Sequence, residues 1–376
     1  MATLKRILSV FGTRPEVIKM APIVRALAED RNFDAKVCVT GQHRQMLDQV
    51  MGLFEITPDF DLDIMKQGQS LTDISARTML GLADVLTQYR PDFVLVQGDT
   101  TTAMASAITS FYHRVKVGHV EAGLRTGDLY SPWPEEANRR LIGILTHFHF
   151  APTHAAKENL FREGVPPSQV FVTGNTVVDA LLSVVERISG SGELQAQCRA
   201  GLPERLDSNK RLIVVTGHRR ENFGAGLERV FSSIAAIAKR EDVQILYPVH
   251  LNPNVRNPAQ EILSGIDNVF LIGPLDYLTF VYVMMQAYFI ITDSGGIQEE
   301  APILGKPLLI TRENTERPEA VHAGTGILVG TDSQRIVTEA MKLLDDQDTY
   351  AVMSRKHNTL GNGYAAKHIV RVLQDV

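Results

Sequence analysis

Short apolar runs recur along the chain, and most of them end at a glycine, a polar or a charged residue. Such runs are typical of strands that are buried in a parallel sheet. They cover residues 7–11, 35–40, 92–96, 115–120, 148–151, 170–173, 211–216, 243–247, 269–272, 289–292 and 307–310. Helices are predicted between several of them, for example at residues 71–88. The alternation predicts an α/β fold with parallel sheets.

The alternation pauses once. Residues 189–209 are polar and aperiodic, which predicts a surface connection, and the strand at residue 211 starts the alternation again. A restart of this kind indicates a second doubly wound domain. We predict two Rossmann-like domains that face a central cleft, residues 1–173 plus 362–376 and residues 174–361, with the last helix packing back on the first domain.

The first strand ends in a turn that carries a cation. Pro15 suits the first position of a helix, and Glu16 complements the helix dipole. Arg14 in the same turn opposes the dipole, so it indicates a bound anion. The alternative for Arg14 and for the nearby Lys19 is a solvated surface charge.

Three carboxylates stand where a ligand is expected. Asp99 and Glu121 come at the ends of two buried strands, and Glu135 stands in the first turn of a helix. Ligands of doubly wound sheets bind outside the carboxyl ends of the strands. These three residues are therefore candidates for acid and base catalysis.

Each carboxylate also has a structural interpretation. Asp99 suits the N-cap of the next helix. Glu121 suits an ion pair with Arg125 or Arg139. Glu135, with its neighbour Glu136, suits the first turn of a helix that has arginines four residues further along.

Two stretches of the second half predict a phosphate site. Residues 217–222 combine a glycine with cations after one strand, and Asp293-Ser294-Gly295-Gly296 follows another. Adjacent glycines lack Cβ atoms, so an anion can reach the N–H groups at the start of a helix. The spacing matches neither the Walker loop nor the dinucleotide fingerprint. The alternatives are surface basicity and an ordinary turn with Ser294 as N-cap.

Composition narrows the class of protein. Of the 376 residues 44% are hydrophobic, enough for two cores, and the formal charge of −5 includes no basic block of the kind that binds nucleic acid. Cys38 and Cys198 are interpreted as free thiols in a reducing compartment, without a metal site. Neither a leader nor an apolar stretch of membrane-spanning length is present, which predicts a soluble cytoplasmic protein.

These features favour a nucleotide diphosphate bound by the second half beside the carboxylates of the first. Arg14, His218, Arg317 and the amides of residues 294–296 would stabilise charge on a departing diphosphate. No nucleophile motif, metal-ligand spacing or nicotinamide fingerprint is present. We therefore expect acid and base catalysis without a metal or a cofactor.

Motifs over essentially the whole chain resemble those of the non-hydrolysing bacterial UDP-N-acetylglucosamine 2-epimerases. The matching motifs are FGTRPE at 11–16, GDTT at 98–101, GHVEAGLR at 118–125, PEEANR at 134–139, TGNT at 173–176, GHRRE at 217–221, TDSGGIQEE at 292–300 and TERPE at 315–319. The combination is highly specific for this family.

The resemblance implies a GT-B fold, usually as a homodimer, and reversible conversion of UDP-GlcNAc to UDP-ManNAc, which supplies ManNAc for envelope polysaccharide. In such enzymes UDP leaves by anti elimination to give 2-acetamidoglucal and adds back with inverted C2. The residues implied as catalytic are Asp99, Glu121, Glu135 and His218. The implied UDP-sugar contacts are Arg14, Lys19, Leu275, Phe280, Ser294, Gly295, Gly296, Glu300 and Arg317.

Within that set, the family pattern places Glu300 on the ribose hydroxyls and Phe280 beside uracil. Leu275 departs from relatives that carry glutamine, so only its backbone can serve there. Some relatives bind a second UDP-GlcNAc as an activator, and the residues that match theirs are Gln42, His43, Gln45, Glu136, Arg219 and His250. Where such relatives carry an arginine, this chain has Gly68.

Rival interpretations share the nucleotide site. A GT-B glycosyltransferase needs an acceptor groove, and the first half shows no apolar or basic surface for one. A hydrolysing UDP-GlcNAc 2-epimerase would release free ManNAc. A nucleotide-sugar sensor would not need three carboxylates at the ends of strands and helices.

Overall fold

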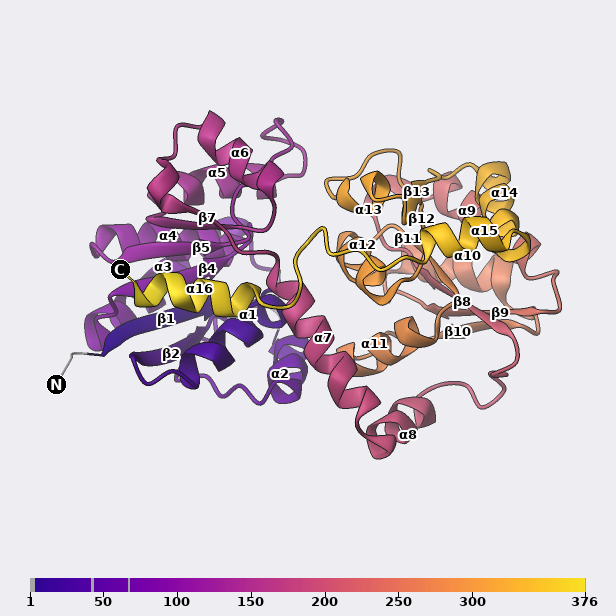
Figure 1. Ribbon diagram of the computed structural model, residues 1–376, viewed down its shortest axis with the longest axis horizontal. Helices are drawn as coiled ribbons and strands as arrows, with labels where there is room; N and C mark the ends of the chain where they lie inside the picture. The colour runs from indigo at the N-terminus through magenta and orange to yellow at the C-terminus, as the bar shows by residue number, and fades with distance from the viewer. Residues whose placement is uncertain (1–3, 42–43, 67, 376) are drawn as a thin grey trace. The chain divides into compact units, whose positions relative to one another are not determined.

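The structure is a computed structural model that describes residues 4–41, 44–66 and 68–375. The chain divides into two compact units (Figure 1). Unit 1 comprises Met1–Ala180 and Leu360–Val376, and unit 2 comprises Leu181–Thr359. The first boundary falls inside helix α7 (Thr176–Ser189), later than the predicted residue 173, because the helix continues from Thr176 without a break.

Unit 1 contains a seven-stranded parallel sheet with the strand order β3-β2-β1-β4-β5-β6-β7. Its strands are β1 (Lys5–Phe11), β2 (Phe33–Val39), β3 (Phe60–Asp61), β4 (Phe93–Gln97), β5 (Lys116–Val120), β6 (Phe148–Ala151) and β7 (Val170–Val172). The chain winds outward from β1 to β3 and then returns to β4 on the other side of β1. The carboxyl ends of β1 and β4 therefore form a topological switch point, where doubly wound sheets bind ligands.

Helices cover both faces of this sheet. They are α1 (Arg14–Ala28), α2 (Arg44–Leu53), α3 (Leu71–Tyr89), α4 (Thr101–Tyr112), α5 (Glu135–Leu145), α6 (His154–Arg162) and the C-terminal α16 (Ala365–Gln374). Helix α4 packs between α3 and α5 in one layer, and α1 packs between α2 and α16 in the other. Leu8, Val94 and Val96 of the sheet pack with Leu82 and Ala103 of the first layer. Burial of this apolar surface is the main contribution to the stability of unit 1.

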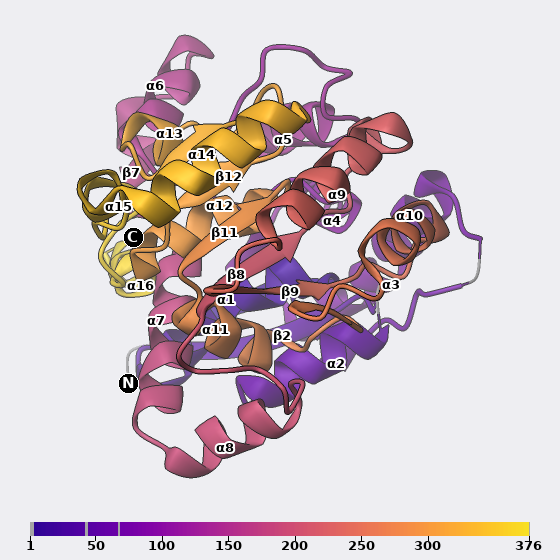
Figure 2. The same ribbon diagram turned by 90° about the vertical axis from the view of Figure 1, so that its right-hand side faces the viewer.

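Unit 2 repeats the plan with a six-stranded parallel sheet in the order β10-β9-β8-β11-β12-β13. Its strands are β8 (Arg211–Thr216), β9 (Val243–Pro248), β10 (Val269–Ile272), β11 (Phe289–Thr292), β12 (Leu308–Ile310) and β13 (Gly326–Leu328). Its helices are α8 (Gly192–Ala200), α9 (Ala225–Ile237), α10 (Pro253–Leu263), α11 (Tyr277–Gln286), α12 (Gly295–Glu300), α13 (Glu319–His322), α14 (Ser333–Asp345) and α15 (Gln347–Met353). The switch point of this sheet lies between β8 and β11, and Figure 2 shows α9, α10 and α14 on one side of these strands.

The C-terminal helix α16 is attached to unit 1 at both of its ends. The carboxylate of Asp179 accepts hydrogen bonds from the backbone N–H groups of Ala365 at 3.2 Å and Ala366 at 2.9 Å. At the other end, Nζ of Lys5 donates to the backbone oxygens of Leu373 at 3.0 Å and Gln374 at 2.9 Å. An anion at the start and a cation at the end of a helix both interact favourably with its dipole. The last helix therefore folds as part of unit 1.

The predicted connection at residues 189–209 is wrong in one respect, because it contains α8. Ser191 caps this helix, and its Oγ accepts a hydrogen bond from Leu194 N at 3.2 Å. Cys198, predicted in a polar stretch, is buried by the helix. The α8 segment contains so few apolar residues that its sequence shows no helical period.

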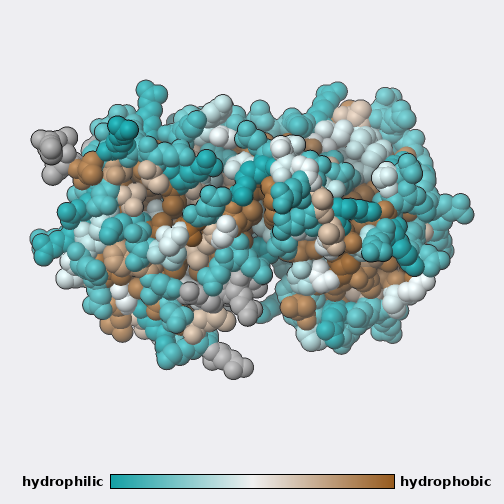
Figure 3. Space-filling view, turned by 90° about the horizontal axis from the view of Figure 1, so that it is seen from below, coloured by the Kyte–Doolittle hydropathy of each residue, from teal (hydrophilic) through white to brown (hydrophobic). Residues whose placement is uncertain are grey.

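No helix in the described part of the chain is long and apolar enough to cross a bilayer. On the face drawn in Figure 3, hydrophilic side chains cover much of the surface. Hydrophobic side chains appear in smaller groups among the hydrophilic ones.

Candidate active site

The turn after β1 starts α1 and carries the first predicted cation. Thr13 is the N-cap, and Glu16 accepts hydrogen bonds from the backbone N–H groups of Gly12 at 3.0 Å and Thr13 at 2.8 Å. This is a capping box, which satisfies donors that the helix cannot. Gly12 has no room for a side chain, because a Cβ atom would lie 2.0 Å from Oγ1 of Thr40 and 2.9 Å from Oγ1 of Thr102. The turn therefore packs tightly against the chain that follows β2 and β4.

Asp99 follows β4 at the switch point of unit 1, and it does not cap α4. The N-cap is Thr100, whose Oγ1 accepts from Ala103 N at 3.0 Å. Helix α5 holds Asp99 instead, since Arg139 Nη1 donates to Oδ2 at 3.1 Å and Asn138 Nδ2 donates to the backbone oxygen at 2.8 Å. The Asp99 side chain is 30% exposed, so a ligand can reach it.

Glu121 follows β5 and forms a buried ion pair with Lys19. Their side chains are 6% and 9% exposed, and Gln97 Nε2 also donates to the Glu121 carboxylate at 3.2 Å. The predicted structural partners Arg125 and Arg139 pair with other carboxylates. The backbone of Glu121 has a φ of 64°, a conformation that is strained for a residue with a Cβ atom and that concentrates at functional sites.

The two glutamates at the start of α5 differ in their surroundings. Glu136 is fully buried and pairs with Arg139 at 3.3 Å and Arg140 at 3.4 Å, and it accepts from Thr126 N at 3.1 Å. The structural interpretation is therefore correct for Glu136. Glu135 is half-buried.

A buried histidine lies behind the Asp99 turn. His119 on β5 contacts the backbone oxygen of Gly98 through Nε2 at 2.7 Å, so Nε2 carries the proton. Burial lowers the pKa of His119 to about 4 and that of His149, its neighbour on β6, to about 3. Both histidines are therefore neutral at physiological pH.

In unit 2, the turn after β8 is organised by one buried carboxylate. Asp293 follows β11 and is 1% exposed, and its Oδ2 accepts from the backbone N–H groups of His218 and Arg219, both at 2.9 Å. Burial lowers the pKa of His218, although Asp293 opposes this shift. The His218 ring stacks on His250 with 5.7 Å between centroids. The predicted catalytic histidine thus lies at the switch point of unit 2.

The glycine turn after β11 starts helix α12. Ser294 takes the N-cap position, but its side chain makes no capping hydrogen bond. A Cβ atom on Gly295 would lie 3.2 Å from Oε1 of Glu316, 3.5 Å from Nη2 of Arg219 and 3.6 Å from Nε of Arg317. The turn therefore lies beside two guanidinium groups, which suit an oxyanion.

Carboxylates hold both of these guanidinium groups. Arg317 Nε lies 2.7 Å from Oε1 of Glu299, and Arg219 Nη2 lies 3.2 Å from Oε1 of Glu316. Glu316 also accepts from Arg312 Nη1 at 2.5 Å. Burial would raise the pKa of Glu316, but its backbone hydrogen bond and the arginines lower it to about 2. The cations are thus held in place before any ligand arrives.

The remaining predicted contacts lie on or near α11 and α12. Glu300 is buried, and its Oε1 accepts from the hydroxyl group of Tyr277 at 2.6 Å. Phe280 and Leu275 are half-buried, as is Arg14 in unit 1. Of the predicted activator contacts, Gln42 and His43 lie outside the described residues, and Gln45 belongs to α2. Gly68 has a φ of 72°, so a side chain there would be strained.

Sequence reasoning did not predict which residues hold the predicted ones. Asn138 and Arg139 hold Asp99, Asp293 holds the His218 turn, and Glu299 holds Arg317. All four fall inside the motifs that carry the family resemblance.

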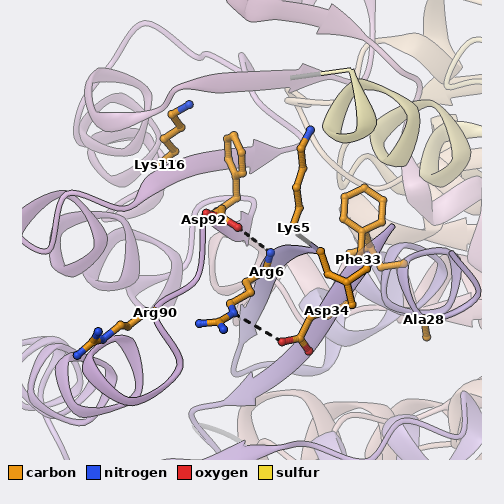
Figure 4. A pocket seen from close by; sticks show the side chains of 12 residues that line it. Lys5, Arg6, Ala28, Phe33, Asp34, Arg90, Asp92 and Lys116 are labelled. Carbon is orange, nitrogen blue, oxygen red and sulfur yellow. Dashed lines mark hydrogen bonds and ion pairs between the residues drawn. The ribbon is translucent and has the colours of Figure 1, made fainter. Parts of the chain in front are cut away.

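A pocket of about 1100 Å³ lies at the opposite, amino-terminal edge of the unit 1 sheet (Figure 4). Two of its carboxylates have partners, because Asp92 accepts a hydrogen bond from Arg6 N at 2.8 Å and Asp34 lies 3.9 Å from Arg6 Nε. None of the predicted site residues lines it. Since ligands of such sheets bind at the carboxyl ends of strands, this pocket is separate from the candidate site.

No group of three or more metal-ligating side chains was found within the described ranges. The family model described as UDP-N-acetylglucosamine 2-epimerase matches residues 25–374. The chain is 58% identical over 374 residues to the UDP-N-acetylglucosamine 2-epimerase of Yersinia pestis, which covers 98% of both chains.

Two solved structures show the same fold. The UDP-GlcNAc 2-epimerase from Neisseria meningitidis, bound to UDP-GlcNAc, has a TM-score of 0.93 at 49% identity and covers 99% of this chain and 100% of that one. The enzyme from Methanocaldococcus jannaschii, in complex with UDP-GlcNAc and UDP, has a TM-score of 0.83 at 32% identity with the same coverage. The predicted pair of Rossmann-like domains of GT-B type is confirmed by this agreement. The chain therefore belongs to the UDP-N-acetylglucosamine 2-epimerase family and is an enzyme of the isomerase class.

Proposed function

We propose that this enzyme interconverts UDP-GlcNAc and UDP-ManNAc by elimination and re-addition of UDP. A base takes the proton from C2, the C1–O bond breaks with its electron pair leaving on UDP, and 2-acetamidoglucal remains. An acid then delivers a proton to the other face of C2 while a diphosphate oxygen bonds to C1. Atoms and electrons balance in both directions, so no redox cofactor takes part.

The observation that carries this proposal is the position of Glu121. A carboxylate in a strained conformation, buried beside Lys19, directly follows a strand next to the one that ends before Asp99. Two carboxylates on adjacent strand ends supply a base and an acid within one unit. Glu135 at the start of α5 is the third candidate in the same unit.

Lys19 takes a role beyond the sugar contact that the resemblance assigned to it. Its ammonium group supplies the opposite charge that lets Glu121 be buried as a carboxylate. A carboxylate held in this form suits the base of the elimination better than the acid. We assign removal of the C2 proton to Glu121. Delivery of a proton to the other face of C2 is assigned to Asp99 or Glu135.

Unit 2 is assigned the nucleotide. The Ser294 to Gly296 turn and Arg317 suit the diphosphate, because backbone N–H groups and a guanidinium group converge there. We assign to His218, whose pKa is lowered by burial, a hydrogen bond to the departing oxygen. Glu300 is assigned to the ribose hydroxyls and Phe280 to uracil, with only the Leu275 backbone in reach of the base. The relative from Methanocaldococcus jannaschii was solved with UDP-GlcNAc and UDP.

One experiment tests the reaction directly. The protein is incubated with UDP-GlcNAc in deuterated water, and C2 is followed by NMR. We expect a mixture of both UDP-sugars with deuterium at C2, and the same mixture from UDP-ManNAc. Free hexosamine as the only sugar product would establish a hydrolase and contradict the proposal, and transfer to an added acceptor would establish a glycosyltransferase.

The acid and base assignment is tested by Asp99→Asn. We expect UDP to bind to this variant with unchanged affinity, because Asp99 is not among the proposed UDP contacts, while turnover falls at least about 100-fold, the usual effect of removing a general acid or base. A sensor without catalysis would show no difference in turnover between the variant and the natural chain.

The product is assigned to the supply of ManNAc for envelope polysaccharide, made in the cytoplasm. This assignment follows from the resemblance. Loss of ManNAc from the polysaccharide of a host lacking the gene, and its return on complementation, would support it. An unchanged polysaccharide would overturn it.

A homodimer is proposed through the outer face of α3, α4 and α5. Helix α4 contains no charged residue, and the exposed apolar side chains of the three helices are Leu80, Phe111, Tyr112, Leu141 and Ile144. A group of exposed apolar side chains on neighbouring helices suits an interaction surface. A two-fold axis would let one patch cover its own copy, as in most homo-oligomers.

Activation by a second UDP-GlcNAc is also proposed. Glu136 and Arg219 already form ion pairs within their units, and His250 stacks on His218. An initial rate that rises more steeply than the first power of UDP-GlcNAc concentration would support activation. A simple hyperbola would overturn it.

A further inference from the structure

A fully buried carboxylate joins the two turns at the switch point of unit 1. Glu16 is 0% exposed, and its Oε2 accepts hydrogen bonds from Gly12 N at 3.0 Å, Thr13 N at 2.8 Å and Thr13 Oγ1 at 2.8 Å. This oxygen organises the turn that carries Arg14. The sequence indicated only that Glu16 complements the dipole of α1.

The other oxygen of Glu16 reaches the second turn. Thr100 Oγ1 donates to Oε1 of Glu16 at 2.6 Å, and the same hydroxyl accepts from Ala103 N at 3.0 Å. Thr100 directly follows Asp99. A continuous chain of hydrogen bonds therefore runs from the first turn of α4 through Thr100 and Glu16 to the turn after β1.

The geometry leaves this contact little freedom. Gly12 packs against Thr40 and Thr102 with no room for a Cβ atom, and Thr40 Oγ1 lies 3.1 Å from Thr102 Oγ1. Burial raises the pKa of Glu16, whereas the hydrogen bonds from Thr100, Gly12 and Thr13 lower it. A carboxylate that accepts from four donors in a closed site fixes the separation of the groups around it.

We infer that Glu16 is a positioning residue for the reaction, which holds the Asp99 turn in register with the Arg14 turn through Thr100. The inference rests on the proposed function, because it matters for catalysis only if Asp99 transfers a proton. A displacement of a catalytic group by about 1 Å can reduce a rate 100-fold. Loss of the bridge should thus lower kcat more than it changes binding.

The test compares three threonine variants of the whole chain. Thr100→Val removes the hydroxyl that bridges to Glu16 and also the N-cap of α4. Thr100→Ser keeps both. Thr153→Val is the matched control, because Thr153 caps α6 in the same unit with a hydrogen bond from Ala156 N at 3.2 Å and contacts none of the site residues.

Initial rates of UDP-GlcNAc epimerisation give kcat and KM, and fluorescence titration gives the affinity for UDP. We expect kcat of Thr100→Val to fall about 10-fold to 100-fold with KM and UDP affinity within about 2-fold. Thr100→Ser should recover kcat to within about 3-fold of the natural chain, and Thr153→Val should match the natural chain.

The outcomes separate this inference from the function beneath it. If the natural chain epimerises UDP-GlcNAc and Thr100→Val has the kcat of Thr153→Val, the inference fails alone. It also fails if Thr100→Val raises KM while kcat is unchanged. If the natural chain does not epimerise UDP-GlcNAc at all, the proposed function fails and takes this inference with it.

Discussion

At the scale of single residues, both units use a buried carboxylate to hold a turn at the switch point. Glu16 does so in unit 1 with two backbone N–H donors, and Asp293 does so in unit 2 with the N–H groups of His218 and Arg219. Carboxylates that accept backbone hydrogen bonds are among the stronger local restraints in proteins. The residues that contact a ligand therefore depend on neighbours that never touch it.

Lys19→Met should destabilise unit 1 and should also lower turnover. The variant leaves the Glu121 carboxylate buried without its partner, and breaking a buried pair in this way costs roughly 3–5 kcal/mol of unfolding free energy. Urea denaturation followed by circular dichroism measures the loss. Turnover should fall in parallel, because the proposed base loses the ammonium group that pairs with it.

The control for this prediction is the double variant Lys19→Met/Glu121→Gln. It removes both charges, so it should recover most of the unfolding free energy while turnover stays low. Equal unfolding curves for the natural chain and for Lys19→Met would show that the ion pair contributes nothing to stability.

The free energy of unfolding should decrease as the pH is lowered, because His119 on β5 is buried. His119 has a pKa of about 4 in the folded chain, against about 6.5 in an unfolded one. Below pH 6.5 the unfolded state binds a proton that the folded state refuses, so stability is full above pH 6.5 and declines as pH falls toward 4. At about pH 5 the loss amounts to about 2 kcal/mol.

Urea denaturation at several pH values between 7.5 and 5 would measure this loss. In His119→Gln the amide can still donate to the Gly98 carbonyl, but it cannot titrate, so the decline should be smaller by about 2 kcal/mol. Identical declines in both proteins would assign the pH dependence to other groups.

At the scale of elements, strands were easier to predict than the helices and turns between them. Strands such as β8 and β11 were located from apolar runs alone, because both faces of a parallel strand are buried. Helix α8 was missed because it buries little, and β3 was missed because it contains only two residues. The short strand β13 was missed as well. Element type follows from local patterns, whereas short or polar elements depend on the packing around them.

The turn after β1 is closely packed at Gly12, whereas Gly52 in α2 has open space beside it. We therefore expect opposite results from the two glycine substitutions. Gly12→Ala places a Cβ atom 2.0 Å from Oγ1 of Thr40, so it should lower the unfolding free energy by about 1–3 kcal/mol and displace the Arg14 turn. Gly52→Ala in α2 meets no atom within 4 Å and should be neutral or stabilise the helix by up to about 1 kcal/mol.

Thermal unfolding and turnover would be measured for both variants. Gly12→Ala should lose turnover with its stability, and adding Thr40→Ala should restore part of both because it removes the nearest atom. A Gly12→Ala protein as stable as Gly52→Ala would mean that the turn is looser than its contacts indicate.

At the scale of the whole molecule, the sequence placed the candidate residues on the correct strand ends in both units. That much follows from topology, because charged residues at the carboxyl ends of parallel strands gather at one edge. It did not show that Glu121 pairs with Lys19, 102 positions apart, or that Thr100 rather than Asp99 caps α4. Pairings between distant residues depend on the register of the sheet, which no local pattern contains. The roles of these residues remain predictions.

The proposed homodimer gives a prediction for the molecule as a whole. Ile144 on α5 is 80% exposed and Phe111 on α4 is 57% exposed, and both lie on the apolar face of α3, α4 and α5. In a monomer, an exposed Ile144→Glu would cost little, within about 0.5 kcal/mol. Across a two-fold axis it would bury carboxylates without partners, so sedimentation velocity should show the dimer dissociating to a 41.6 kDa monomer. Val352→Glu, on α15 of unit 2 and 50% exposed, is the control and should leave the dimer intact. A natural chain that sediments as a monomer at micromolar concentration would contradict the proposed dimer.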